Sequence, residues 1–270
     1  MAEAKQKLQA QDRLSSILRR LHAGGTVAVA DLAREFSISD MTVRRDLAEL
    51  ERDGLLERVH GGARRSAAGP LRLIDDVEPT FDARAAHNRS AKAAIARAAA
   101  QALAGFRSIA MDIGTTTLLA AEALAIQPGA DKQQIFTNSL RIAGVVAGRV
   151  GEVYLSGGRV RPDEQSLLGP GAINAFAHLN FEVAVLGVSG VTDEGFFDYS
   201  IEETEMKRLY LNRSAHRIVL CDSSKFHRLS TTRICALGAV DLLITDAAPP
   251  PELESALKGA GVALRIAAPN

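Results

Sequence analysis

The sequence predicts an α/β protein in which an N-terminal winged helix-turn-helix is joined to a larger, mostly parallel α/β domain. Three observations predict this fold. Short amphipathic helical segments separated by tight breaks fill residues 13–52. From residue 108 onward, apolar segments that end in Gly, Ser, Thr or Asn alternate with helical segments. Between these regions the hydrophobic periodicity lapses over residues 66–80, around Gly69, Pro70 and Pro79. We therefore expect domains at residues 1–65 and 81–270, with a linker at residues 66–80.

The composition is that of an ordinary globular protein. The chain has 270 residues, of which 47% are hydrophobic and 24% are charged, and its formal net charge is zero. Zero net charge does not exclude DNA binding, because DNA requires a local basic surface rather than a basic whole. The N-terminal quarter offers such a surface through Arg44, Arg45, Arg52, Arg58, Arg64 and Arg65.

The cysteines and the lengths of the apolar segments indicate in which cellular compartment the protein is expected. Cys221 and Cys235 have neither C-x-x-C spacing nor a histidine cluster nearby, so we predict no disulfide framework, no metal site and no cofactor. The N-terminus lacks the apolar core of a signal peptide, and no window reaches 18 apolar residues. We expect a cytoplasmic protein with no membrane partner.

Apolar residues at helical spacing mark the first two helices. The first helix covers residues 13–21, ends at Gly24-Gly25, and has its apolar positions at Leu14, Ile17, Leu18 and Leu21. The second lies in V-A-V-A-D-L-A-R-E-F at residues 27–36, with Leu32, Ala33 and Phe36 on one face. A break at residues 37–39 then leads to a third helix, which is the spacing of a helix-turn-helix.

The third helix is the candidate DNA-reading element. Ser39 is a good N-cap, and Gly54 can end the helix in the left-handed region. One side is an apolar stripe of Val43, Leu47 and Leu50. The other side suits the major groove, and we predict DNA contacts from Ser39, Met41, Thr42, Arg44, Arg45 and Arg52. The alternative is an ordinary amphipathic surface helix with solvated arginines.

A wing follows the third helix. The residues L-L-E-R-V-H-G-G-A-R-R at 55–65 indicate a short strand, a Gly61-Gly62 turn and a basic exit. This arrangement would place His60, Arg64 and Arg65 along the phosphate backbone, and we predict His60 and Arg64 as DNA contacts.

The larger domain begins with an alanine-rich helix predicted over residues 81–103, which contains no internal Gly or Pro. Seven apolar segments are then predicted as strands, the last at an edge, at residues 108–113, 134–137, 152–155, 183–186, 217–221, 242–245 and 262–266. Their alternation with helices predicts a mostly parallel sheet.

Polar and glycine-rich residues gather at the carboxyl ends of these strands, where open α/β sheets bind ligands. The glycines allow close approach of the backbone, the hydroxyls and the helix starts suit an anion, and Lys225 adds a point charge. We predict effector-binding residues at Asp112, Gly114, Thr115, Thr116, Thr117, Thr137, Asn138, Gly157, Gly158, Gly187, Ser189, Gly190 and Lys225. For any single loop, the alternative is that these are turn and cap residues.

The motifs as a set resemble a known family. The run D-L-A-R-E-F-S-I-S-D-M-T-V-R-R-D-L, followed by R-V-H-G-G-A, resembles the winged helix-turn-helix of the DeoR family of bacterial transcriptional regulators. This resemblance implies a regulator, in most family members a repressor of sugar, polyol or nucleoside operons, that responds to a phosphorylated metabolite.

The resemblance extends over the second domain, which is similar to the DeoR sensor domain and implies the fold of ribose-5-phosphate isomerase. Phe81, Arg84, Asn88, Lys92 and Ile95 fall where the family tends to keep such residues. Glu202, Glu203 and Lys207 match its segment ahead of the next helix. Asp198 and Tyr199 in F-D-Y, and D-A-A-P-P-P near the end, look most like the branch that senses glycerol 3-phosphate. Tyr199 and Glu203 therefore join the predicted effector-binding residues.

Two functions of different classes are compatible with these features. The first is a repressor that binds double-stranded operator DNA as a homodimer or homotetramer and is released by glycerol 3-phosphate or a sugar phosphate. The second is a sugar-phosphate isomerase with an appended DNA-binding domain, for which Asp112 or Glu203 with Lys225 would supply acid-base chemistry. No histidine stands in the strand-end motifs. We therefore predict no enzyme and no catalytic residues, while an activator or a non-phosphorylated effector stays open.

Overall fold

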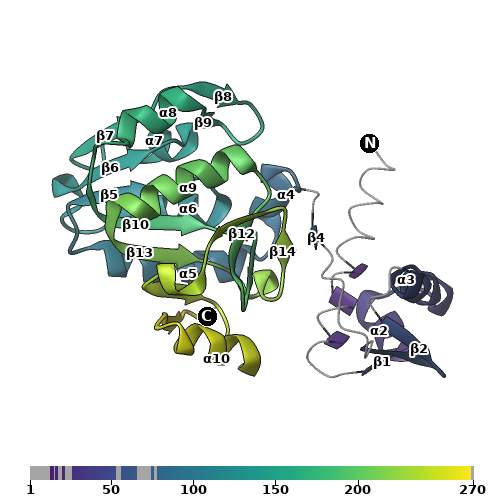
Figure 1. Cartoon of the computed structure of the whole chain (residues 1–270). Coiled ribbons are helices and arrows are strands. Elements are labelled where there is room, and N and C mark those ends of the chain that lie inside the picture. Colours follow the sequence, from purple (N-terminus) through teal and green to yellow (C-terminus); the bar gives the residue numbers. More distant parts are fainter. Residues whose placement is uncertain are drawn as a thin grey trace. The chain divides into compact units, whose positions relative to one another are not determined.

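The computed structural model describes residues 13–14, 16–17, 20–21, 26–52, 56–65, 74–75 and 78–268. The chain divides into two compact units, Met1–Leu73 and Ile74–Asn270 (Figure 1). Several predicted features lie outside the described residues: the helix ends at Gly24-Gly25 and Gly54, the apolar position Leu18, and residues 66–73 and 76–77 of the linker.

The N-terminal unit is a winged helix-turn-helix. Its elements in order are β1 (Thr26–Ala28), α2 (Val29–Phe36), α3 (Asp40–Arg52), β2 (Leu56–Val59) and β3 (Gly62–Arg65). The strands form one antiparallel sheet in the order β1-β3-β2. The predicted apolar stripe of α3 is confirmed, because Val43, Leu47 and Leu50 are buried in the core of this unit.

The second helix starts inside the segment V-A-V-A-D-L-A-R-E-F in which it was predicted. Residues 26–28 form the strand β1, which was not predicted, and the helix begins at Val29 with Asp31 in its first turn. Val27 pairs with Ala63 of β3 across the sheet. The β-branched Thr26 and Val27 favour a strand, and pairing with a segment far along the chain decides the outcome.

Asp46 of α3, which belongs to the motif run of the sequence, is a buried structural residue. Its carboxylate accepts two hydrogen bonds from the Arg13 guanidinium, at 2.6 and 3.0 Å. We expect Asp46→Ala to destabilise the N-terminal unit by about 2–3 kcal/mol, because two charge-assisted hydrogen bonds in a partly buried site would be lost. Chemical denaturation of the full chain, monitored through the N-terminal unit, measures this change. An effect below about 0.5 kcal/mol would show that the pair contributes little.

The second unit is built on a seven-stranded sheet that is parallel throughout. Its strands in chain order are β5 (Ser108–Met111), β6 (Gln134–Thr137), β7 (Glu152–Leu155), β10 (Phe181–Gly187), β13 (Ser214–Leu220), β16 (Leu242–Thr245) and β17 (Ala263–Ile266). Their order across the sheet is β17-β16-β13-β10-β5-β6-β7. All seven predicted strands are present, and the last is an edge strand as expected.

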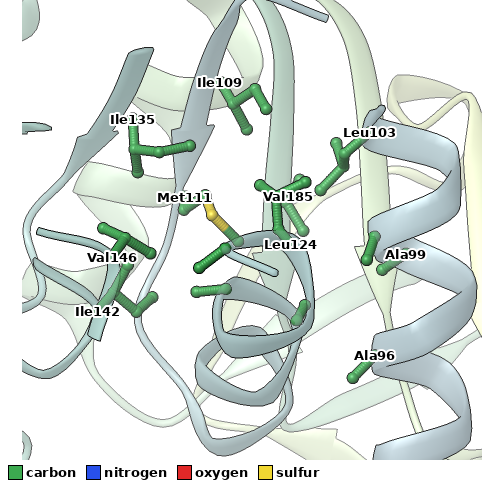
Figure 2. Close-up of a cluster of buried hydrophobic side chains, with 14 of the residues drawn as sticks. Ala96, Ala99, Leu103, Ile109, Met111, Leu124, Ile135, Ile142, Val146 and Val185 are labelled. Carbon is green, nitrogen blue, oxygen red and sulfur yellow. The ribbon is translucent and has the colours of Figure 1, made fainter. Parts of the chain in front are cut away.

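Helices cover both faces of this sheet. The helices α5 (Arg89–Leu103), α6 (Thr115–Leu124) and α7 (Leu140–Val146) share one apolar core with the sheet. Figure 2 shows part of it, with Ala96 and Ala99 of α5 facing Leu124 and Val185. The helices α8 (Pro170–Phe176), α9 (Ile201–Arg213) and α10 (Pro251–Gly259) bury their apolar sides in a second core on the other face. Burial on both faces explains why the strands read as continuous apolar runs.

The helix predicted over residues 81–103 is in fact two helices, α4 (Phe81–Ala86) and α5. The chain turns between them at Asn88, which has a left-handed backbone with φ of 52°. The Asn88 amide donates a hydrogen bond to the Asp222 carboxylate at 2.8 Å. Asparagine tolerates this conformation better than most residues, and a partner 134 residues away fixes it.

Short elements that the sequence did not predict surround the sheet. They are a hairpin of β8 (Arg159–Arg161) and β9 (Ser166–Leu168), a small sheet of β11 (Gly190–Thr192), β12 (Gly195–Asp198) and β15 (Thr232–Cys235), the pair β4 (Ile74–Asp75) with β14 (Leu229–Ser230), and the 3-10 turns η1 (Ala130–Lys132), η2 (Ser223–Lys225) and η3 (Leu237–Ala239). Among the described helices, none is both long and apolar enough to cross a membrane.

Candidate nucleic-acid interface and ligand pocket

Helix α3 presents a polar, basic face away from its buried stripe. The predicted cap is confirmed, because the Ser39 hydroxyl accepts a hydrogen bond from the Thr42 N–H at 3.2 Å. The two hydroxyls of Ser39 and Thr42 also lie 2.9 Å apart. Met41 is 74% exposed, and Arg44, Arg45 and Arg52 are exposed. The packing of α3 uses its opposite side and leaves these side chains at the surface.

The wing is formed by β2, β3 and the turn between them. His60 is exposed in this turn, and Arg64 is exposed on β3. The Arg64 guanidinium pairs with Glu57 across the hairpin at 2.7 Å, an exposed ion pair that water and salt weaken. The N–H of Arg58 donates to the Glu51 carboxylate at 3.1 Å, which links the wing to α3. The side chain of Arg65 lies outside the described part of the chain.

The second unit has a pocket at the carboxyl ends of β13, β10 and β5, three neighbouring strands of the sheet. Eight of the predicted effector-binding residues line it: Gly114, Thr115, Thr116, Gly187, Ser189, Tyr199, Glu203 and Lys225. The lining also includes eleven residues outside that predicted set: Glu78, Arg84, Lys92, Ile113, Glu164, Val188, Asp198, Lys207, Leu220, Cys221 and Asp222.

One wall of the pocket is the start of helix α6. Gly114 is its N-cap, with φ of 135°, and Thr115 and Thr116 belong to its first turn. The N–H groups of a first helical turn have no partner within the helix, and the helix dipole favours an anion there. The Thr117 hydroxyl donates to the Gly114 carbonyl at 3.0 Å and so points back into the cap. This wall therefore offers backbone donors and hydroxyls to an anionic ligand.

A buried ion cluster surrounds Lys207 of α9. Its ammonium pairs with the Asp112 carboxylate, lies 3.1 Å from the Asp198 carboxylate, and donates to the Gly187 carbonyl at 3.0 Å. Lys207 is 3% exposed and Asp112 is fully buried. Burial alone would lower the pKa of Lys207, but the Asp112 and Asp198 charges outweigh it, so the pKa is raised and the amine stays charged.

A second ion cluster lies at the acidic side of the pocket. Arg84 of α4 pairs with both Glu78 and Glu164. Arg161 of β8 pairs with Glu78 at 2.5 Å and with Glu203 at 2.9 Å. Burial raises the pKa of Glu203 to about 7, although the Arg161 charge opposes this change. These two arginines pair with three of the five acids that line the pocket.

Lys225 differs from the other cations of the pocket. Its ammonium makes neither an ion pair nor a hydrogen bond with any residue that the structure describes. Burial, reinforced by the charge of Arg228, lowers its pKa to about 8, although the charge of Asp222 opposes this change. A desolvated cation with neither an ion pair nor a hydrogen bond lowers its free energy when an anionic group binds beside it.

We expect Lys225→Met to raise the melting temperature of the protein by a few degrees at pH 7. Below about pH 8 the lysine is protonated both folded and unfolded, and burial of its charge costs stability. As the pH rises from about 8 to the ordinary lysine value of 10.5, this cost disappears. The variant and the wild type should therefore melt together at still higher pH. Thermal denaturation across this range measures the difference, and a less stable variant at pH 7 would contradict the expectation.

Among the described residues, the other predicted effector positions do not line the pocket. The carboxylate of Asp112 is buried and accepts a hydrogen bond from the pocket residue Lys207. The Thr137 hydroxyl accepts from the Ser139 N–H at 3.1 Å. Asn138 is bound to the β9 strand, since its carbonyl accepts from the Leu167 N–H at 2.7 Å. The remaining positions are Thr117, described above, and Gly157, Gly158 and Gly190; Gly158 and Gly190 each lie against a carbonyl group so closely that a Cβ would collide.

The carboxylates proposed for isomerase chemistry already have partners. Asp112 is paired with Lys207, and Glu203 forms an ion pair with Arg161 and accepts a hydrogen bond from the Ser166 hydroxyl at 3.0 Å. No group of three or more His, Cys, Asp or Glu residues in the described part of the chain could hold a metal ion. Both described cysteines are free thiols.

A winged helix-turn-helix and a separate ligand pocket define a ligand-responsive DNA-binding regulator. Residues 13–67 match the family described as the DeoR-like helix-turn-helix domain, and residues 87–247 match the DeoR C terminal sensor domain. The chain belongs to the DeoR family of transcriptional regulators. Its relatives include proteins named as repressors of the aga operon, the glycerol-3-phosphate regulon and the lactose phosphotransferase system.

Two curated relatives illustrate the family membership. A putative aga operon transcriptional repressor from Escherichia coli O157:H7 is 30% identical over 93% of this chain and 91% of its own length. The glycerol-3-phosphate regulon repressor of Escherichia coli K12 is 29% identical over 88% of this chain and 91% of its own length. Among solved structures, ribose 5-phosphate isomerase A from Methanocaldococcus jannaschii matches 52% of this chain and 55% of its own, with 13% identity and a TM-score of 0.37. This structural likeness is too low to bear on function.

Proposed function

We propose that the protein represses a sugar or polyol operon and leaves its operator when a phosphorylated metabolite fills the pocket. The observation that carries this proposal is Lys225, an unpartnered cation in a pocket that also contains the start of α6. A cation and a helix start together favour a ligand with a phosphate group, while hydroxyls and carboxylates on the other walls can bind sugar or polyol hydroxyls.

The DNA side of the proposal rests on α3 and the wing. Met41, Thr42, Arg44 and Arg45 would read base edges in the major groove, with Ser39 and Arg52 beside them and His60 and Arg64 on the phosphate backbone. We propose a homodimer or homotetramer, because two-fold symmetry would match a palindromic operator with half-sites about one helical turn or a multiple apart. The site of action would be the cytoplasm, where bacterial operator DNA lies.

The effector we place first is glycerol 3-phosphate. A relative at 29% identity is named a glycerol-3-phosphate regulon repressor, and Asp198 and Tyr199 of the F-D-Y segment line the pocket. A sugar phosphate is the other member of the same class. The isomerase alternative receives no support from Asp112 or Glu203, whose carboxylates are engaged in ion pairs.

Thermal denaturation with a panel of ligands tests this proposal. The panel pairs each phosphorylated compound with its parent, such as glycerol 3-phosphate with glycerol. A phosphorylated ligand at about 100 times its Kd should stabilise the protein by about 2.7 kcal/mol, which corresponds to a rise of a few degrees in Tm. Equal shifts with the parent compounds, or no shift with any phosphorylated member, would refute the phosphate requirement. Turnover of pentose phosphates would instead favour the enzyme.

A further inference from the structure

The residues that lead into the second unit are attached beside the pocket at two points. The first is β4, which pairs in parallel with β14. Strand β14 begins four residues after Lys225, and its Ser230 hydroxyl lies 2.7 Å from the hydroxyl of the pocket residue Ser189. The second point is Glu78, which lines the pocket itself. We call Ile74, Asp75 and Glu78 the connector, because the N-terminal unit ends at Leu73.

Glu78 is held by two guanidinium groups, and each of these is shared with a more deeply buried acid. Arg84 also pairs with Glu164, and Arg161 also pairs with Glu203. The side chain of Glu78 is 14% exposed, whereas those of Glu164 and Glu203 are 2% exposed. Three carboxylates thus share two arginines, and Glu78 is the one that can most easily move toward solvent.

Arg84 is the arginine of this cluster that a ligand can reach, because it lines the pocket and Arg161 does not. Its Nε is buried and has no hydrogen-bond partner among the described residues. An anionic group that enters the pocket would gain this donor and the positive charge beside it. The same anion would repel the neighbouring carboxylate of Glu78, since like charges in a partly buried site interact strongly.

We propose that the effector releases the connector by taking the Arg84 guanidinium away from Glu78. Glu78 then keeps its pairing with Arg161 but loses that with Arg84, so the second attachment of the connector is weakened and the short pairing of β4 with β14 opens more readily. The connector is the part of the second unit next to Leu73 in the chain, so its release loosens the point from which the chain continues into the N-terminal unit. This inference rests on the proposed function, since it uses the same pocket and an anionic effector. Linkage then requires the reverse effect: weakening the Glu78 attachment should make anion binding easier.

Hydrogen exchange of the full-length protein tests the release directly. In the wild type, saturating glycerol 3-phosphate should accelerate amide exchange in peptides that cover residues 74–80 and 226–231, by about tenfold or more. The Glu78→Gln variant, which keeps the shape but loses the charge, should exchange rapidly in the same peptides without any ligand. Calorimetry should find that this variant binds glycerol 3-phosphate about 3–10-fold more tightly than the wild type, a gain that a merely structural role would not produce.

Glu202→Gln is the matched control, because Glu202 pairs with Arg159 at 2.7 Å on the exposed surface. This control should change neither exchange nor ligand affinity. If glycerol 3-phosphate binds but exchange at residues 74–80 stays unchanged or slows, the connector proposal is overturned and the proposed function stands. If no phosphorylated probe binds, both the connector proposal and the proposed function are refuted. The exchange experiment on the wild type tests the release without any variant, so it decides the question even if the Glu78→Gln protein folds poorly.

Discussion

Arg45→Ala is expected to abolish specific operator binding while both units remain folded. Arg45 is exposed on the face of α3 opposite the buried Val43, Leu47 and Leu50, so truncation removes no packing. A bidentate arginine–guanine contact is worth about 1–3 kcal/mol of discrimination, and a dimer would lose two of them. The operator affinity should therefore fall by about 30-fold or more. The operator is first recovered with the wild type by selection from random duplexes, and both proteins are then compared at one salt concentration.

Arg34→Ala provides the matched control for this experiment. Arg34 is an exposed arginine on α2 whose guanidinium pairs with Asp31 of the same helix. Its loss should leave the operator affinity near the wild-type value. An equal loss of affinity for operator and random DNA in Arg45→Ala would mark Arg45 as a phosphate contact rather than a base contact. Unchanged operator affinity would remove Arg45 from the reading surface altogether.

Local signals made much of the fold predictable from the sequence. The Ser39 cap and the apolar stripe of α3 depend only on neighbouring residues, and both are present. The seven strands of the parallel sheet were also recognisable, because burial on both faces gives each a continuous apolar run. Features fixed by distant partners were missed. These include β1, which pairs with β3, and the turn at Asn88, which binds Asp222.

The site was harder to predict because strand order, rather than strand ends alone, decides which loops meet. Residues after β5, β10 and β13 line the pocket, since these strands are neighbours. The ends of β6 and β7 lie farther along the sheet. Asn138, which follows β6, is hydrogen-bonded to β9 instead of lining the pocket. Glu78 and Glu164 were missed for another reason. Glu78 comes from the segment before α4 and Glu164 from the loop between β8 and β9, and no local pattern connects them to a sheet edge.

Lys225→Ala should leave operator binding intact but blunt release by the effector. The wild-type ammonium makes neither an ion pair nor a hydrogen bond among the described residues, so an anion bound beside it adds a contact that the free protein lacks. Losing one member of a partly buried charge pair costs about 2–5 kcal/mol, so the affinity for glycerol 3-phosphate should fall by about 30-fold or more. Calorimetry measures this affinity, and the concentration of effector that halves operator occupancy should rise in parallel. A normal effector response would remove Lys225 from the site.

The pH dependence of ligand binding tests the charge of Lys225 independently of its shape. Because burial lowers its pKa to about 8, the wild-type affinity for glycerol 3-phosphate should decline as the pH rises through that value. Lys225→Arg keeps its charge over this range, so its affinity should stay level even if its fit is poorer. At pH 7, Lys225→Ala should also lose the cost of a buried charge, offset in part by the packing of the lysine stem. If Lys225→Ala keeps the stability of the ligand-free protein but loses the rise in Tm that the ligand causes, unfolding cannot explain the loss. That combination would assign Lys225 to the effector rather than to the fold.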